Sequence, residues 1–248
     1  MLEKIFKKIV KRAFFKGGYS INKIGSFDFF QLIMDAFLKK NNELFFIQIG
    51  ANDGKSFDPI YEFVINNHKN VRGILLEPLE DYFMELKRNY KGYSNVTILN
   101  LAVHNSNKEM IIHRVDPKKI ERNEQPEWTK GIASFNGNHH ELSGTPKEVI
   151  IKQNVKCISL EDLLRTHQVA KIDLLQIDTE GYDSEIILNI DFKAIKPKVI
   201  HFEHGLEHEI MSKEEFTALA DLLHNNGYDL FMDQYDCTAY QRNILIDL

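Results

Sequence analysis

Cysteine is nearly absent from this chain, whose 248 residues include only 2 cysteines, Cys157 and Cys237. Two cysteines cannot build a disulfide framework or a thiolate zinc site, so we expect both thiols to be reduced in the core of a cytoplasmic protein. The sequence also lacks an apolar run of about 18 residues, the length that a membrane-spanning helix needs. Neither sign of charge dominates, since the net charge is −5, and this balance does not indicate nucleic acid as a partner.

The remaining composition is that of an ordinary globular protein, with 43% hydrophobic and 27% charged residues. The length suits one domain with elaborations, and the composition leaves the oligomeric state open. We divide the chain into a helical extension at 1–43 and a main domain at 44–248. Residues 116–148 are polar and poor in periodic apolar positions. We interpret them as a long insertion that covers a substrate, because long loops are uncommon and often functional.

The N-terminal residues form an amphipathic basic pattern. Between residues 2 and 13, apolar side chains recur on one helical face, and lysine or arginine side chains fill the other. This pattern lacks the apolar core and cleavage site of a secretory signal. It predicts that residues 1–16 form an interfacial helix on an anionic membrane, at the inner surface for a cytoplasmic protein. The alternative is an arm that packs on its own domain or on a second subunit, or that frays.

Strand and helix patterns alternate along the main domain. Apolar runs predict strands at 44–49, 71–76, 96–103, 110–115, 155–158, 172–177, 198–202 and 228–232, with a further strand near the C-terminus. Amphipathic patterns predict helices from a Ser26 cap to residue 41, at 59–66, 80–90, 184–188 and 213–225, and after the capping residue Ser159. This alternation predicts an α/β fold with a doubly wound, mostly parallel sheet.

Polar or glycine-containing segments follow four of the predicted strands. They are residues 50–54, Glu77-Pro78, residues 178–181 and Glu203-His204. Ligands of open α/β sheets bind beyond the carboxyl ends of the strands, so these four segments should meet there. Backbone N–H groups of the glycine turn can bind an anionic group, and the Glu77 carboxylate can accept hydrogen bonds from ribose hydroxyls. The pattern therefore predicts a nucleoside cofactor.

The glycine turn differs from the dinucleotide fingerprint. Gly-x-Gly-x-x-Gly would place glycine at positions 52 and 55, where this chain has Asn52 and Lys55. The spacing of a Walker loop is not met either. Both departures favour a nucleoside that lacks a pyrophosphate.

The chain resembles the FkbM family of S-adenosylmethionine-dependent methyltransferases. The most specific matching segment is Leu174 to Asp183, which holds the acidic turn Asp178-Thr179-Glu180-Gly181. Gln176 and Asp183 depart from the lysine and glutamate more usual in the family, and neither change removes a carboxylate from the turn. The matching segments, in the family's order between residues 44 and 205, are 49–54, 77–78, 100–103, 158–163 and 174–183.

The resemblance implies a class I methyltransferase fold, which is Rossmann-like with a seven-stranded sheet, and S-adenosylmethionine as the methyl donor. Glu77 would hold the cofactor ribose, and Ala102 or Val103 would lie near the adenine edge. By position, the implied cofactor contacts are Gly50, Ala51, Asn52, Asp53, Gly54, Ser56, Glu77, Pro78, Ala102, Val103 and Asp178.

The resemblance also implies that the methyl group is passed to a hydroxyl oxygen. Such a transfer requires a base or a metal ion, because an alcohol is a poor nucleophile until its proton is removed. The candidate bases are Asp178, Glu180, Glu203, His201 and His204. On the strand at 198–204, His201 and Glu203 share one face and His204 lies on the other. The alternative is that Asp178, Glu180 and Glu203 hold Mg²⁺, which prefers oxygen ligands.

The insertion contains four residues that could belong to a site. His139 and His140 resemble part of a metal cluster, but adjacent histidines in an extended segment diverge, so we interpret them as a solvated loop. Trp128 can stack on a sugar or anchor the loop, and we favour the anchor. Ser134 is a weak active-site candidate, because the family often has small residues in this region.

The sequence thus favours a cytoplasmic O-methyltransferase whose acceptor is a sugar, a glycan or another hydroxylated small molecule. The resemblance favours sugar, and the basic arm would suit a lipid-linked acceptor. One alternative acceptor is a phenolic or polyketide hydroxyl. An alternative of another class is a non-catalytic, cofactor-binding interaction domain. Nucleic acid is disfavoured, because the only dense basic run is the arm at residues 1–16.

Overall fold

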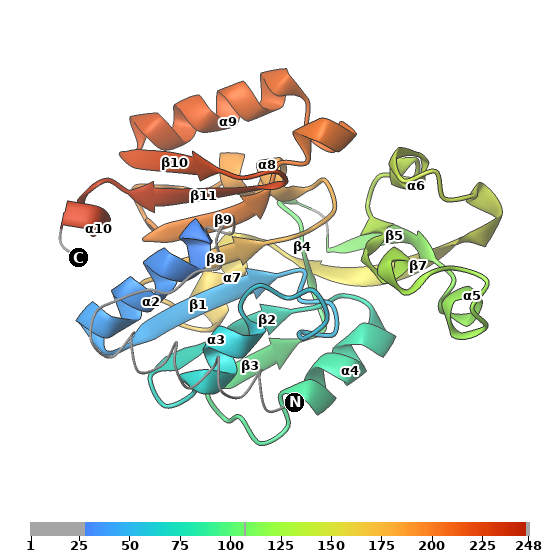
Figure 1. Ribbon diagram of the computed structural model, residues 1–248, viewed down its shortest axis with the longest axis horizontal. Helices are drawn as coiled ribbons and strands as arrows, with labels where there is room; N and C mark the ends of the chain where they lie inside the picture. The colour runs from blue at the N-terminus through green and yellow to red at the C-terminus, as the bar shows by residue number, and fades with distance from the viewer. Residues whose placement is uncertain (1–27, 107, 247–248) are drawn as a thin grey trace.

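The computed structural model describes residues 28–106 and 108–246 (Figure 1). The basic arm at 1–16 and Ser26 lie outside the described residues, so membrane contact through the arm stays a prediction. Within the described part of the chain, no helix is long and apolar enough to cross a membrane. The first described helix, α2 (Phe29–Asn41), is capped by Asp28, whose carboxylate accepts a 2.8 Å hydrogen bond from the Gln31 N–H.

A seven-stranded sheet forms the centre of the molecule, in the order β10-β11-β9-β8-β1-β2-β3. Its strands are β1 (Leu44–Ile49), β2 (Val71–Leu76), β3 (Val96–Leu99), β8 (Leu174–Ile177), β9 (Val199–Glu203), β10 (Tyr228–Met232) and β11 (Asp236–Gln241). All neighbours pair in parallel except β11, which is antiparallel to both β9 and β10. The predicted class I fold, a doubly wound and mostly parallel seven-stranded sheet, is confirmed.

Helices cover both faces of this sheet (Figure 1). One face packs against α2, α3 (Tyr61–Asn66) and α4 (Glu80–Asn89), and the other against α7 (Leu160–Thr166), α8 (Asp183–Leu188) and α9 (Lys213–Asn225). Strand β1, which is apolar except for Gln48, is buried on both faces. Leu44 and Phe46 contact the first helical layer, whereas Ile47 and Ile49 contact the second.

The strand order reverses between β1 and β8, which are parallel neighbours in the sheet. From β1 the chain proceeds to β2 and β3 on one side, and β8 is followed by β9 on the other. Ligands of doubly wound sheets bind at this topological switch point. The glycine turn after β1 and the acidic turn after β8 are therefore placed side by side by the topology.

The chain leaves the main sheet after β3, and the predicted single strand at 96–103 is wrong. The Asn100 amide donates hydrogen bonds to the carbonyl oxygens of Glu77 and Pro78, at 3.0 Å each, and fixes this break. Strand β4 (Ala102–Val103) then pairs with β7 (Ile150–Ile158) in a second sheet.

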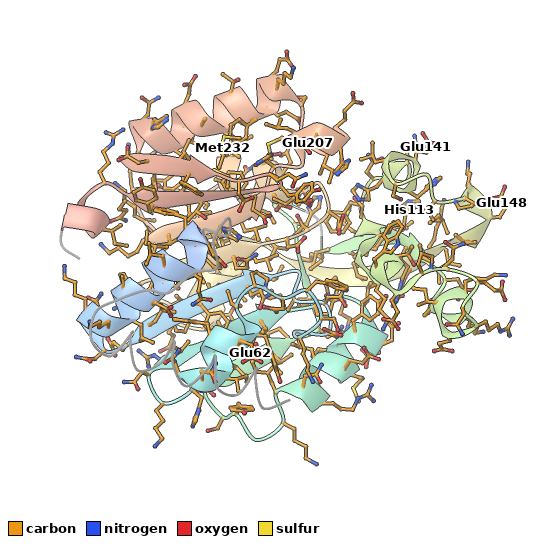
Figure 2. All side chains as sticks on the ribbon, in the orientation of Figure 1. Glu62, His113, Glu141, Glu148, Glu207 and Met232 are labelled. Atoms are coloured by element: carbon orange, nitrogen blue, oxygen red, sulfur yellow. The ribbon has the colours of Figure 1, made fainter. Side chains whose placement is uncertain are left out.

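The second sheet has four strands in the order β4-β7-β5-β6, where β5 is Glu109–Val115 and β6 is Ala133–Ser134. The predicted structureless insertion instead contains short elements, namely α5 (Pro117–Glu121), η1 (Glu127–Gly131), α6 (His139–Leu142) and η2 (Lys147–Val149). We name residues 102–158 the lobe. Figure 1 shows the lobe projecting from one side of the main sheet, and the labels of His113, Glu141 and Glu148 mark it in Figure 2.

A buried arginine joins the lobe to α4. Arg114 on β5 donates two hydrogen bonds, of 2.6 and 2.8 Å, to the carboxylate of Asp81. Its guanidinium also lies 4.4 Å from the ring centroid of Tyr82. A planar bidentate pair of this kind fixes orientation as well as distance, so Arg114 holds the lobe at a defined angle to the helix.

Candidate active site

A pocket opens at the carboxyl ends of β1, β2 and β8, between the main sheet and the lobe. The main domain contributes the glycine turn, the end of β2 and the acidic turn, and the lobe contributes one wall. The lining residues are Gln48, Ile49, Gly50, Ala51, Asn52, Ser56, Phe57, Asp58, Pro59, Glu77, Pro78, Leu79, Tyr82, Leu101, Ala102, Val103, Ile112, Trp128, Lys130, Gly131, Ala133, Phe135, Asp178, Thr179 and Glu180. The pocket thus brings together most of the predicted cofactor residues, with Asp178 and Glu180 of the predicted bases.

The glycine turn is packed against the acidic turn. Gly50 has a φ of 82°, and a Cβ at this position would lie 1.8 Å from the carbonyl oxygen of Asp178. The N–H groups of Gly50 and Ala51 both donate to the Leu76 carbonyl, at 3.1 and 2.9 Å. Glycine is therefore required at position 50 both for its backbone conformation and for this close approach.

Two predicted cofactor residues, Asp53 and Gly54, lie behind the turn rather than on the pocket wall. The Asp53 carboxylate accepts hydrogen bonds from the Lys55 N–H, the Ser56 N–H and the Ser56 hydroxyl, at 2.7 to 2.9 Å. Gly54 packs so closely on α4 that a Cβ would lie 2.2 Å from Leu86 Cδ1. Their direct contact with the cofactor stays a prediction, and their position in the structure is one that shapes the turn.

Glu77 is a buried carboxylate on the pocket wall. Its Oε2 accepts a hydrogen bond from the Asn52 N–H and its Oε1 accepts one from the Leu79 N–H, each at 2.8 Å. Burial raises the pKa of Glu77 to about 7, although both of these hydrogen bonds oppose the rise. Each carboxylate oxygen keeps a lone pair after these contacts, so Glu77 can still accept hydrogen bonds from two hydroxyl groups.

Gln48 is a site residue that the sequence reasoning missed. Its Nε2 donates a 2.9 Å hydrogen bond to Asp58, whose pKa is raised by burial, and its Oε1 is buried without a partner among the described residues. A buried acceptor on a pocket wall calls for a donor from the ligand. The available signal was a polar residue in the otherwise apolar strand β1.

These features fit S-adenosylmethionine. Glu77 would hold the ribose hydroxyls, and Gln48 would offer an acceptor for the ammonium of the methionyl part. The adenine would meet an apolar wall, since Leu79, Tyr82, Ala102 and Ile112 form one buried hydrophobic cluster where the pocket borders the lobe.

Carboxylates crowd the end of the sheet beside the pocket. Asp183 accepts hydrogen bonds from the Thr179 N–H at 3.0 Å, from the Thr179 hydroxyl, and from the Glu203 N–H at 3.2 Å. The surrounding protein, reinforced by neighbouring carboxylates, raises the pKa of Asp183 to about 6, of Glu203 to about 8 and of Asp236 to about 6. Neighbouring buried carboxylates cannot all be ionised at little cost, so this cluster retains protons near neutral pH.

Asp178 opens directly into the pocket from this cluster. Its side chain is exposed on the pocket side, but protein surrounds the carboxyl on the other sides. This environment raises the pKa of Asp178 well above its ordinary range, and the nearby Glu180, Asp183 and Glu203 carboxylates add to the rise. A carboxyl with a raised pKa in a cleft is a candidate for proton transfer.

Glu180 is held by the lobe. Its Oε2 lies 2.8 Å from Nε2 of His139 on α6, and its carbonyl oxygen accepts a 2.6 Å hydrogen bond from the Ser134 hydroxyl on β6. The predicted solvated loop at His139 and His140 is wrong, because both side chains are buried. Adjacent residues diverge in an extended segment, but here they form a helical turn that packs inside the lobe.

The remaining predicted bases lie outside the pocket lining. His201 stacks on Phe30 with 3.9 Å between ring centroids, and its Nδ1 lies 2.9 Å from the Thr238 hydroxyl. Burial lowers the pKa of His201 to about 4. The His204 ring contacts the Leu206 N–H, the Asp233 carbonyl and the edge of Phe216. Both rings are thus engaged in packing, and Glu203 belongs to the carboxylate cluster next to the pocket.

The expected magnesium ligands do not form a metal site. Among residues 28–106 and 108–246, no group of three or more histidine, cysteine, aspartate or glutamate side chains is arranged to hold a metal ion. Asp178, Glu180 and Glu203 offer the oxygen atoms that Mg²⁺ prefers, but they are not arranged to hold the ion together.

Two exposed aromatic residues line the pocket, one from the main domain and one from the lobe. Phe57 in the loop after β1 is 88% exposed, and Trp128 on η1 of the lobe is 51% exposed. Phe57 also has a φ of 60°, which is unfavourable for a bulky residue. Trp128 is too exposed for the anchor role favoured from the sequence. Both side chains are available to a ligand that enters the pocket.

The chain is similar to a known protein family over most of its length. The model of the Methyltransferase FkbM domain matches residues 48–230. No curated protein matches the chain. Among solved structures, precorrin-6Y C5,15-methyltransferase from Geobacter metallireducens is 14% identical with a TM-score of 0.41, over 85% of this chain and 88% of that chain.

Two further solved structures are similar at the same level. Human methyltransferase 10 domain containing protein is 12% identical with a TM-score of 0.43, over 85% of this chain and 79% of its own. The METTL16 methyltransferase domain is 12% identical with a TM-score of 0.44, over 85% and 65%. At these scores, the likenesses do not bear on the acceptor or on the residues of the site.

Proposed function

The chain belongs to the FkbM family of S-adenosylmethionine-dependent methyltransferases, and we propose that its acceptor is a hydroxyl group of a sugar or glycan. The observation that carries this proposal is the juxtaposition, in one pocket, of exposed Phe57 and Trp128 with the carboxylates of Asp178 and Glu180. Aromatic faces pack against the apolar C–H face of a sugar ring, and carboxylates accept hydrogen bonds from its hydroxyl groups.

The donor half of the site consists of the glycine turn, Gln48 and Glu77. Bound S-adenosylmethionine supplies a methyl group on a sulfonium sulfur, so that the C–S bond breaks as the acceptor oxygen bonds to the methyl carbon, the electron pair stays on sulfur, and the hydroxyl proton is left for a base. The protein then has two tasks, which are to align the acceptor and to receive that proton. Gln48 on β1, the glycine turn after β1 and Glu77 after β2 would hold the donor, and the residues at the mouth of the pocket would align the acceptor.

We assign the proton-accepting role to the acidic turn. Asp178 and Glu180 both line the pocket, whereas Glu203, His201 and His204 do not. One carboxylate removes the proton of the acceptor hydroxyl, and the other accepts a hydrogen bond from a neighbouring hydroxyl of the same sugar. The two histidines have no part in this mechanism, because their rings are occupied in packing.

A panel of acceptors tests the proposal. The full chain would be incubated with S-adenosylmethionine carrying a labelled methyl group, and with sugars and oligosaccharides in one set and phenols in another. We expect label in the sugar set, and we expect Trp128→Ala to lower sugar methylation at least tenfold without weakening S-adenosylhomocysteine binding. Met232→Ala is the matched control, since Met232 is 42% exposed on β10, away from the pocket (Figure 2). Label in phenols alone would overturn the sugar acceptor, and binding without transfer to any acceptor would favour a non-catalytic role.

A further inference from the structure

Glu180 is held in an unusual backbone conformation. Its φ of 53° lies in the left-handed region, which non-glycine residues adopt rarely and at an energetic cost. Such a residue persists only when its surroundings fix it. The main sheet does not account for this, because Glu180 lies beyond the end of β8.

Three elements of the lobe supply the constraint. Ser134 on β6 donates a hydrogen bond to the Glu180 carbonyl oxygen, and His139 on α6 contacts Oε2 of its carboxylate. Gly131 on η1 passes so close that a Cβ there would lie 3.2 Å from Oε1. Both the backbone and the side chain of Glu180 are thus in contact with residues that are 41 to 49 positions away in the sequence.

The contact with His139 determines where the carboxylate points. When the Glu180 carboxylate is ionised it can only accept hydrogen bonds, and Nε2 of His139 is then the donor in the 2.8 Å contact. The His139 side chain is 9% exposed and that of Glu180 is 26% exposed. The histidine is therefore enclosed by protein, and the carboxylate keeps an open side that faces the pocket.

We propose that His139 is a positioning residue of the methyl transfer, which holds the Glu180 carboxylate toward the acceptor hydroxyl and makes Glu180 the base. This proposal rests on the proposed function and deepens it. The acceptor proton moves to Glu180, while the N–H of His139 remains bonded to the other carboxylate oxygen. The lobe thereby completes a catalytic group of the main domain, so an acceptor that binds against the lobe meets a base aligned by the same element.

Kinetics on a sugar that the wild-type chain methylates would test the proposal. We expect His139→Ala to lower kcat by about 10²-fold, the low end for loss of a positioned acid or base, with little change in the KM for S-adenosylmethionine. His139→Gln should recover most of the activity, because its amide can donate to the same oxygen. Glu141→Ala is the control, as Glu141 is an exposed residue of the same helix (Figure 2).

A double variant separates positioning from simple loss of structure. If His139 acts through Glu180, His139→Ala should lower kcat no further in a Glu180→Ala background. Additive losses, or a His139→Gln variant as impaired as His139→Ala, would overturn the proposal. Failure of the proposed function looks different, since the wild-type chain would then methylate no sugar.

A readout independent of the acceptor uses amide hydrogen exchange of residues 179–181. His139→Ala should accelerate exchange there, whereas His139→Gln and Glu141→Ala should not. Unchanged protection in His139→Ala would show that the acidic turn does not depend on this contact and would overturn the proposal.

Discussion

The backbone N–H of Asn52 donates a 2.8 Å hydrogen bond to the carboxylate of Glu77. The bond links the turn after β1 to the end of β2, so the two segments first noticed in the sequence form one unit. Leu79 bonds the second oxygen of the same carboxylate. A change at Glu77 therefore affects the shape of the glycine turn as well as any contact with ribose.

Ionisation of Glu77 should control cofactor affinity. Because its pKa is about 7, the carboxylate that accepts ribose hydroxyls forms as pH rises through neutrality. We expect the affinity for S-adenosylhomocysteine, measured by calorimetry, to rise by roughly tenfold between pH 6 and pH 8. Glu77→Gln should bind more weakly and with a flatter pH dependence. Identical pH profiles for the two proteins would contradict the ribose assignment.

Gly50→Ala should remove cofactor binding and much of the stability. Its Cβ would lie 1.8 Å from the Asp178 carbonyl oxygen, so one of the two turns must move. Gly92→Ala is a matched control, because Gly92 has a φ of 94° with no atom within 4 Å of its added Cβ. The control should cost about 1–2 kcal/mol for the backbone conformation alone. Gly50→Ala should cost more, on the order of 4 kcal/mol, as measured by urea unfolding. Equal costs would show that the close approach is not constraining.

Stability should fall as the pH rises from 6.5 to 8. The pKa of Glu203 is raised to about 8 from an ordinary 4.5, so the folded state binds its proton more tightly than the unfolded state does. The resulting stabilisation is complete below pH 4.5 and is lost as pH rises through 8. His201 has the opposite slope, since its lowered pKa of about 4 adds stability between pH 4 and 6.5. Glu203→Gln should therefore flatten the fall in Tm between pH 6.5 and pH 8. An unchanged slope would argue that the cluster does not titrate in this range.

Replacing either partner of the ion pair that joins the lobe to α4 should have unequal effects on the free energy of unfolding. The Arg114 side chain is 2% exposed, whereas that of Asp81 is 42% exposed. Asp81→Asn leaves a buried guanidinium without its carboxylate and should cost about 3 kcal/mol or more. Arg114→Met leaves only the Asp81 carboxylate, which water can reach. The methionine side chain fills the space of the arginine stem, so we expect a smaller loss of unfolding free energy. A larger loss for Arg114→Met would indicate that contact with Tyr82 dominates.

Local patterns predict the main sheet because each of its strands carries its own signal. The segments from Leu44 to Ile49 and from Ile172 to Ile177 are mostly apolar, interrupted only by Gln48, Asp173 and Gln176, and a glycine or an acidic residue follows each directly. Parallel topology then requires that these ends converge. The order of the strands was enough to predict that the glycine turn and Glu77 lie close together, whereas the bond from Asn52 to Glu77 is seen only in the structure.

The predicted strands at 110–115 and 155–158 are confirmed as β5 and part of β7, but the rest of the lobe escapes prediction for physical reasons. The apolar run at 96–103 has no break in its pattern strong enough to reveal that Asn100 bonds to the end of β2. Strand β6 has two residues, too few for periodicity. The contact between His139 and Glu180 depends on how the lobe packs against the main domain. The role of Gln48 becomes visible only through its hydrogen bond to Asp58 on the other side of the turn. In each case the decisive partner is supplied by tertiary structure.

The departure of the chain from the main sheet at Asn100 has a consequence for how new activities arise. The donor contacts proposed at Gln48, the glycine turn and Glu77 all precede this point. The lobe, which adds Ala102 and Ile112 to the wall expected to meet the adenine, follows it as a continuous segment with its own small sheet. We therefore expect exchange of residues 102–158 between relatives to transfer acceptor preference, provided that the recipient keeps the carboxylates of Asp81 and Glu180, which Arg114 and His139 of the lobe contact. Sequence variation among homologues with different acceptors should accordingly concentrate in this segment.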